Sequence, residues 1–267
     1  MDFLYNECKK ELSNLTGINF ITLTPRCNAA IKLALRVAQN LEKKHCYILD
    51  QGGWMTYEPF AKKQGFTMHT IKTKTSVLNL KELHFEKDSI LIMHSLSAYC
   101  NPQPMKEIYE VCKQQDCLLI NDCSGSITDP DLLYGDIFVG SFGKWKPINN
   151  GKGGFIGTKD KHLDKEIMFE EFDVSSEQLL EKITHAKNRV AKNNEKSLAI
   201  MDVLQEKFPN IKIYNPNILK NQNLVVLCSY SEEIAEFCTE QEWPIEICPR
   251  DIRITIPAIS IETKRFD

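Results

Sequence analysis

The feature that most constrains this chain is a series of short apolar runs, rich in β-forming residues, that alternate with helix-prone stretches. Such alternation favours a mostly parallel sheet with helices on both faces. Residues 90–93 and 117–120 are apolar at every position, which is typical of strands buried on both sides. The runs predict a sheet of seven strands, at residues 18–23, 46–49, 67–71, 90–93, 117–122, 137–142 and 154–158.

The pattern changes after Lys159. A long charged stretch predicts one linking helix from Ser175 to Phe208. Beyond it, strands are expected at residues 211–214, 223–230 and 251–257, with a helix at residues 231–241 between the last two. The sequence therefore predicts an α/β domain over residues 1–165, and a linking helix with a small α+β domain over residues 166–267.

Composition narrows the classes of function. The net charge is −3 and lysines are interspersed with glutamates, so we expect neither nucleic acid nor an anionic membrane as partner. The ten cysteines include no CxxC pair, which argues against a zinc motif and a disulfide framework. No apolar leader core opens the chain, and no window approaches 18 uninterrupted apolar residues. We expect a cytoplasmic protein that acts on small molecules.

The segment GDIFVGSFGKWKPINNGKGGF, residues 135–155, carries the most specific chemistry. A strand that ends in serine and is followed by lysine can offer a hydroxyl to a phosphate and an amine to an aldehyde, while glycines allow close backbone approach. A single lysine beside a glycine-rich turn would be interpreted as a solvated loop residue. Here the serine, the lysine and the glycines fit one pattern together, which favours a functional lysine.

The frame G-D-x-x-x-x-S-F-x-x-x-K-x-x-x-x-G-x-G-G resembles the cofactor-lysine segment of the DegT/DnrJ/EryC1/StrS aminotransferases, which belong to fold type I. The matching positions are Gly135, Asp136, Ser141, Phe142, Lys146, Gly151, Gly153 and Gly154. The resemblance implies a pyridoxal-phosphate-dependent transferase with pyridoxal 5'-phosphate as a Schiff base on Lys146 and the hydroxyl of Ser141 beside the phosphate. Lys144 also follows the serine, but if it were the cofactor lysine, the glycines that follow would no longer match the family's spacing.

Asp122 closes a predicted buried strand upstream of Lys146. The resemblance implies that its carboxylate pairs with the pyridine nitrogen and keeps the ring an electron sink. A strand-ending aspartate can instead cap a turn. In the segment QGGWMTYEPF, Trp54 aligns with the aromatic residue or histidine that stacks on the cofactor ring in the family, although a large aromatic at such a place is commonly part of the core.

Arg26, Cys27 and Asn28 lie between a strand and an apolar helix. A helix N-terminus offers free N–H groups and a favourable dipole to an anion. The resemblance implies that this turn holds the cofactor phosphate. The family usually has Ser-Gly-Thr here, so the backbone rather than a particular side chain is the expected contact. The alternative is that Asn28 caps the helix.

Arg253, in DIRITIP, resembles the arginine that clamps the substrate α-carboxylate in amino-acid aminotransferases. The alternative is an edge-strand arginine paired with Glu246 or Asp251, and Arg250 is a second candidate for the clamp.

Three polar residues, Ser97, Tyr99 and Asn101, follow the strand at residues 90–93 and reach the same rim, and the sequence does not choose among them. His94 is interpreted as a satisfied strand histidine.

The predicted function is transamination with an amino-acid donor and an unknown acceptor, in a homodimer. Two alternatives stay open. One is a pyridoxal-phosphate-dependent lyase acting on an amino acid. The other is an inactive cofactor-binding homologue, suggested by a chain shorter than typical members of the family and by Gly125, where the family usually has glutamine or histidine.

Overall fold

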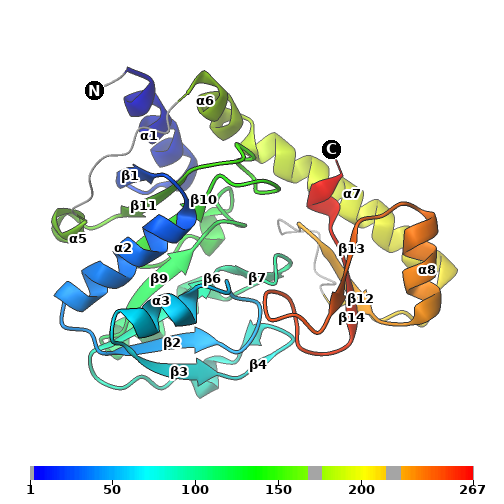
Figure 1. Ribbon diagram of the computed structural model, residues 1–267, viewed down its shortest axis with the longest axis horizontal. Coiled ribbons are helices and arrows are strands. Elements are labelled where there is room, and N and C mark those ends of the chain that lie inside the picture. Colours follow the sequence, from blue (N-terminus) through cyan, green and yellow to red (C-terminus); the bar gives the residue numbers. More distant parts are fainter. Residues whose placement is uncertain (1–2, 168–175, 215–223, 267) are drawn as a thin grey trace.

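The computed structural model describes residues 3–167, 176–214 and 224–266. A seven-stranded sheet forms its centre, in the order β1-β11-β10-β9-β6-β2-β3 (Figure 1). The strands are β1 Phe20–Thr24, β2 His45–Leu49, β3 Thr67–Ile71, β6 Ser89–His94, β9 Leu118–Asp122, β10 Ile137–Ser141 and β11 Gly154–Thr158. From β3 to β10 all neighbours are parallel, and β11 runs antiparallel to both of its neighbours, β10 and β1. The predicted mostly parallel, seven-stranded sheet is confirmed.

Helices cover both faces of this sheet, which explains the continuous apolar runs. Helices α2 (Cys27–Asn40) and α3 (Tyr57–Lys63) pack on one face with Ile90 and Ile120. On the other face, Leu91 packs with α4 (Met105–Gln114), and α1 (Phe3–Thr16) covers the β1 end. None of the helices in the described ranges is long and apolar enough to span a membrane.

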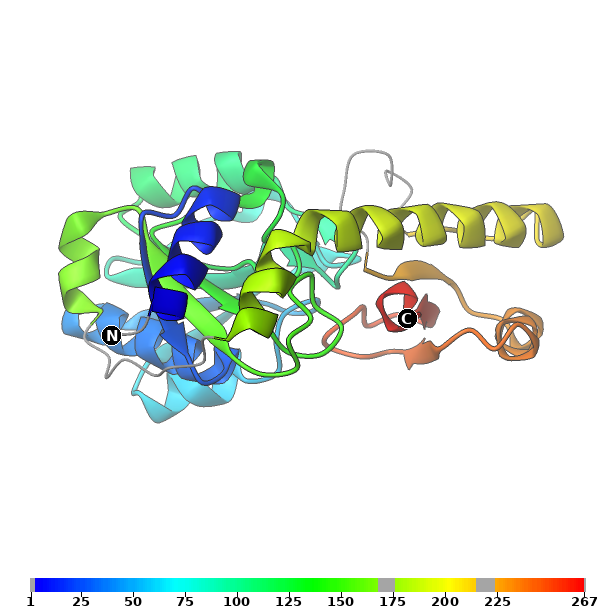
Figure 2. The same ribbon diagram turned by 90° about the horizontal axis from the view of Figure 1, so that it is seen from above.

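Two helices stand where one linking helix was predicted. They are α6 (Glu177–Thr184) and α7 (Ala186–Lys207), and the predicted start at Ser175 lies outside the described residues. Leu179 and Ile183 of α6 pack with α1, whereas residues near the end of α7 pack with the small domain. The chain bends between them because the two segments bury their apolar faces in different cores. Figure 2 shows α7 extending from the large domain along the small one.

The small domain contains a three-stranded antiparallel sheet in the order β12-β14-β13. Its elements are β12 Val226–Ser229, α8 Glu232–Glu240, β13 Ile245–Cys248 and β14 Ala258–Ile261. The strand predicted at residues 251–257 is wrong: this segment is part of the loop between β13 and β14. Pro249 precedes it and Pro257 ends it, and both lack the N–H that a strand ladder needs. Residues 211–214 contribute only an isolated bridge, from Ile213 to Cys228.

Shorter elements connect these parts. They are the strands β4 Thr73–Lys74, β5 Val77–Leu78, β7 Leu96–Ser97 and β8 Asn101–Pro102, the helix α5 Lys161–Glu166, and the 3-10 helices η1 Leu80–Glu82, η2 Pro130–Leu132 and η4 Thr263–Arg265. The pair β7 and β8 forms a small hairpin directly after β6. This hairpin reaches the carboxyl edge of the parallel strands, where ligands of open α/β sheets bind.

Candidate active site

A cavity of about 280 Å³ lies at the carboxyl edge of the sheet. Ligand sites commonly have volumes of roughly 300–1,000 Å³, so the cavity suits a small molecule. All seven residues that the sequence proposes around the cofactor line it: Arg26, Cys27, Asn28, Trp54, Asp122, Ser141 and Lys146. They come from four places in the chain that the parallel topology brings to one edge.

The amine of Lys146 faces this cavity. Its Nζ donates a hydrogen bond to the hydroxyl of Tyr99, and it lies 3.9 Å from the centre of the Tyr99 ring and 5.8 Å from the centre of the Trp54 ring. Lys144 is exposed and does not line the cavity. The structure therefore brings Lys146, rather than Lys144, together with the other candidate residues.

Of the three polar residues on the rim, the structure places Tyr99 in the cavity. Ala98 and Tyr99 form the turn between β7 and β8 with positive φ angles of 53° and 65°, which are uncommon outside glycine. Ser97 and Asn101 do not line the cavity, and the amide of Asn101 binds the backbone oxygen of Thr75 instead. The hairpin thus directs one aromatic hydroxyl at Lys146.

The carboxylate of Asp122 is buried, and both of its oxygens have polar partners. Oδ2 accepts a hydrogen bond from the Tyr57 hydroxyl at 2.6 Å and lies 3.0 Å from Nε2 of His94, while Oδ1 accepts from the backbone N–H of Ser124 at 3.0 Å. Burial alone would raise the pKa of Asp122, but the opposite charge of His94 and these hydrogen bonds outweigh it and hold the pKa well below the usual range. The site therefore presents a stable anion.

Tyr57 and His94 are site residues that sequence reasoning missed. His94 lines the cavity, so its interpretation as a plain strand histidine is incomplete. His94 ends β6 directly opposite Asp122 on β9, a register that becomes visible only when the strand order is known. Tyr57 is the first residue of α3, and its hydrogen bond to Asp122 joins residues 65 positions apart, so no local pattern in the sequence pointed to it.

The first turn of α2 forms the polar end of the cavity. No side chain of the described residues caps this helix, and the first N–H groups of a helix lack intrahelical acceptors. Asn28 is not the cap, because its Oδ1 accepts hydrogen bonds from Nε1 of Trp54 at 3.0 Å and from Oγ1 of Thr56 at 3.3 Å. Asn28 instead fixes the indole of Trp54, which also packs partly against the core of α2 and α3.

Strand β11 closes this end of the cavity by approaching α2 closely. A Cβ atom at Gly154 would lie 2.7 Å from the backbone nitrogen of Cys27, so only glycine permits this contact. Gly153 forms an isolated bridge with Arg26. The glycines of the lysine segment thus form a backbone cradle beside the helix N-terminus.

Cys27 places a thiol in the cavity, with Sγ 3.7 Å from Oγ of Ser124. Burial and the negative charge of Asp122 raise the pKa of the Cys27 thiol well above its usual value. The sulfur is therefore protonated near neutral pH and is a poor nucleophile.

Arg253 is outside the residues that line the cavity. Its guanidinium is buried and donates two hydrogen bonds from Nη2 to the oxygens of Glu262, both at 2.9 Å. Neither partner considered from the sequence is correct, since Glu246 pairs with Arg250 and Arg265. A role of Arg253 in substrate binding would require displacement of Glu262, and it stays a prediction.

Gly125 lies beside Tyr99 rather than leaving an open space. A Cβ atom at position 125 would lie 3.2 Å from Cδ1 of Tyr99 and 3.3 Å from Cδ2 of Leu96. The absence of a side chain at this position accommodates the tyrosine ring.

Comparison with known families decides the class of protein. A family model described as the DegT/DnrJ/EryC1/StrS aminotransferase family matches residues 5–197. The chain belongs to this family. It is thus a pyridoxal-phosphate-dependent aminotransferase, and the predicted enzyme class and cofactor are confirmed.

Solved structures show the same fold at low identity. A DegT/DnrJ/EryC1/StrS aminotransferase from Brucella abortus is 12% identical with a TM-score of 0.76, covering 98% of this chain and 85% of its own. NtdA from Bacillus subtilis, with bound PMP, is 14% identical (TM-score 0.77; 98% and 73% covered). A cysteine desulfurase from Thermococcus onnurineus is 13% identical (TM-score 0.73; 97% and 78% covered). No curated protein matches the chain.

Proposed function

We propose that this family member transfers the amino group of an amino acid to an unidentified carbonyl acceptor, with pyridoxal 5'-phosphate attached to Lys146. The supporting observation is that one cavity joins a lysine amine, a buried anionic carboxylate and an uncapped helix N-terminus. When bound, the cofactor supplies an electron sink for negative charge at the substrate Cα.

Each end of the cavity fits one end of this cofactor. The low pKa of Asp122 keeps a negative charge where a protonated pyridine nitrogen needs a partner. The N–H groups of Cys27 and Asn28, with the hydroxyl of Ser141, suit a phosphate. Trp54, held by Asn28, would stack on the ring.

Lys146 carries the proton transfer in this proposal. With the cofactor bound, the free amine of Lys146 would be the base that takes the proton from the substrate Cα and holds it for return. The hydroxyl of Tyr99 orients Nζ of Lys146 for this transfer.

The donor is proposed to be an amino acid, and the residue behind this proposal is Arg253. If Arg253 exchanges Glu262 for a substrate carboxylate, Arg253→Ala should weaken amino-acid use by ~2 kcal/mol while the cofactor stays attached. Rates of half-transamination with glutamate, aspartate and alanine would measure this. Arg250→Ala is the matched control, and equal rates in all three proteins would remove the argument for an amino-acid donor.

The lyase alternative includes desulfuration, because a cysteine desulfurase shares the fold. That reaction needs a nucleophilic sulfur near the substrate. Among the described residues, Cys27 is the cysteine that lines the cavity, and its raised pKa keeps it protonated. The site therefore favours transamination over a reaction through a thiolate.

Borohydride reduction of the protein with its cofactor, followed by peptide mapping, tests the attachment. We expect the label on Lys146, and a label on Lys144 or none at all would overturn the proposal. An amino-acid panel then tests the reaction. Formation of pyridoxamine phosphate supports transamination, release of ammonia with a keto acid supports a lyase, and no conversion supports the inactive homologue.

A homodimer with composite active sites belongs to this proposal, because the resemblance to fold-type-I enzymes implies a cofactor cleft at the subunit boundary that the partner completes. Light scattering would test it. A monomer that still turned over substrate would contradict it.

A further inference from the structure

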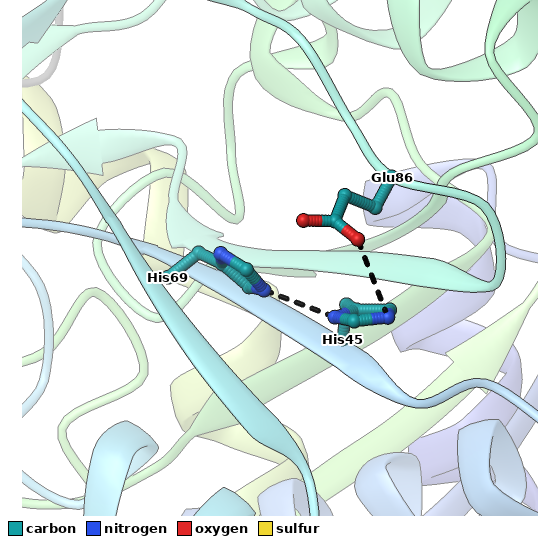
Figure 3. A group of neighbouring side chains, drawn as sticks. All are labelled: His45, His69 and Glu86. Atoms are coloured by element: carbon teal, nitrogen blue, oxygen red, sulfur yellow. Dashed lines mark hydrogen bonds and ion pairs between the residues drawn. The ribbon is translucent and has the colours of Figure 1, made fainter.

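A second cluster of polar side chains lies at the opposite edge of the sheet from the cavity. His45 is the first residue of β2, His69 lies in the edge strand β3, and Glu86 lies in the loop that leads into β6 (Figure 3). Tyr47 of β2 pairs with His69, so the two histidines lie diagonally across neighbouring parallel strands. Nothing in the proposed transamination uses these residues.

The two imidazoles are already close to a chelating arrangement. Nδ1 of His45 lies 3.0 Å from Nε2 of His69, and Nε2 of His45 lies 3.7 Å from Oε2 of Glu86. One ligand atom from each residue lies within 4.8 Å of those of the other two. With Zn–N bonds of about 2.05 Å, two nitrogens of a tetrahedral site are roughly 3.3 Å apart. The spacing of the two histidine nitrogens is within a few tenths of an ångström of that value. To bind one ion, the rings must turn so that both lone pairs point at it, and the carboxylate of Glu86 must swing from Nε2 of His45 to the Nδ1 side.

Tyr47 holds both sides of the cluster. Its ring stacks on His69 with centres 4.5 Å apart and planes inclined by 12°, and its hydroxyl accepts a hydrogen bond from the backbone N–H of Glu86 at 3.1 Å. Such outer contacts orient the ligands of metal sites. The side chain of Glu86 is 61% exposed, so its carboxylate can turn toward the nitrogens and an ion can enter from solvent.

We propose that His45, His69 and Glu86 bind one Zn²⁺ ion, with water completing the coordination. Two imidazoles and one carboxylate form a ligand set used for zinc, whereas Mg²⁺ and Ca²⁺ prefer oxygen ligands alone. The ion takes the place of the hydrogen between the two imidazoles, and that proton moves to the other nitrogen of the same ring, so both histidines bind as neutral imidazoles. It ties the loop before β6 to the strands β2 and β3, and so stabilises this edge of the large domain.

Titration of the metal-stripped, full-length protein with Zn²⁺ against a chromophoric chelator tests the site. We expect one ion per chain, with affinity reduced tenfold or more in His45→Gln and in His69→Gln, and an increase in Tm on zinc addition that these variants lose. His84→Gln is the matched control, because His84 is an exposed histidine of the same loop outside the cluster. It should bind zinc as the wild type does.

Co²⁺ binding provides a second readout, because its spectrum distinguishes nitrogen and oxygen ligands from thiolates. A spectrum without thiolate bands, present in Lys146→Ala and lost in His69→Gln, supports the site independently of the cofactor. Equal Zn²⁺ affinity in the wild type and both cluster variants would overturn the proposal. So would thiolate bands that disappear in Cys27→Ser, or no saturable binding at all.

Discussion

Two lysines approach the same tyrosine ring from the two domains, and their surroundings differ. Nζ of Lys146 lies 3.9 Å from the centre of the Tyr99 ring, and Nζ of Lys264 lies 4.9 Å from it. Lys146 is half-buried and faces a cavity, whereas Lys264 is 4% exposed and paired with Glu262. An amine becomes available for chemistry where the fold gives it space instead of a carboxylate partner.

In the cluster around Lys264, this lysine shares the single carboxylate of Glu262 with Arg253, and Arg265 lies 3.7 Å from the same carboxylate. Burial and the charge of Arg253 lower the pKa of Lys264, Glu262 opposes both, and the net result is a pKa of about 7. Burial would raise the pKa of Glu262, but Lys264 and Arg253 together lower it to about 2. Sharing one carboxylate with other cations therefore makes the protonated form of Lys264 less favourable than it is in water.

The largest expected effect separates the two lysines by chemistry. Lys146→Ala should abolish covalent attachment of the cofactor and slow half-transamination by on the order of 10²–10⁴-fold, because the variant lacks the base. Lys264→Met and Lys144→Ala should both retain the attachment. Mass spectrometry after borohydride reduction measures the label, and loss of the label in Lys264→Met would erase the distinction.

The next effect concerns stability. Glu262→Gln leaves Arg253 and Lys264 buried without their carboxylate, which should lower the free energy of unfolding by about 3–5 kcal/mol. Glu58→Gln is the control, because it breaks the exposed pair of Glu58 and Lys62 and should cost less than about 0.5 kcal/mol. Urea unfolding at pH 7 measures both, and equal losses would show that the cluster is not a tightly coupled unit.

A smaller effect should appear as a dependence on pH. The pKa of Lys264 is about 7 in the folded chain and ordinarily 10.5, so between these values the unfolded chain binds more protons and stability rises with pH. In Lys264→Met this rise is absent. The free energy of unfolding of the variant minus that of the wild type should therefore fall by about 1–2 kcal/mol from pH 7 to pH 9. A constant difference across this range would contradict the lowered pKa.

The smallest effect isolates the hydroxyl of Tyr99. Tyr99→Phe removes the hydrogen bond to Lys146 but keeps the ring beside Arg253 and Lys264. A loss of about 0.5–1.5 kcal/mol corresponds to a roughly twofold to tenfold slower half-transamination, with the free energy of unfolding nearly unchanged. Stopped-flow rates and urea unfolding of the same preparation would show whether the ring and the hydroxyl act separately.

The sheet and most of the cavity were predictable because their signals are local. Buried strands are apolar residue by residue, and Asp122 and Ser141 end their strands, while Cys27 and Asn28 follow theirs. Parallel topology then brings such residues to one edge.

The lysine cluster was not predictable in this way. Glu262, Lys264 and Arg265 form a charged stretch that resembles an exposed terminus, and only contacts between distant segments bury two of them. The segment at residues 251–257 was wrongly predicted because its local pattern indicates a regular strand that the fold does not form. Its β-branched residues favour a strand, but Ile254 is buried within an irregular loop and Arg253 is directed at Glu262.

The contact of Gly125 with Tyr99 limits which residues of related enzymes can be introduced into this one singly. The glutamine or histidine usual in the family would, if introduced at position 125, push on the ring of Tyr99 and so move the hydroxyl that holds Lys146. Positions 99 and 125 are therefore coupled as a pair, although 26 residues separate them along the chain. A chimera that takes position 125 from a relative but keeps Tyr99 would displace Lys146. Positions 99 and 125 must therefore be exchanged together.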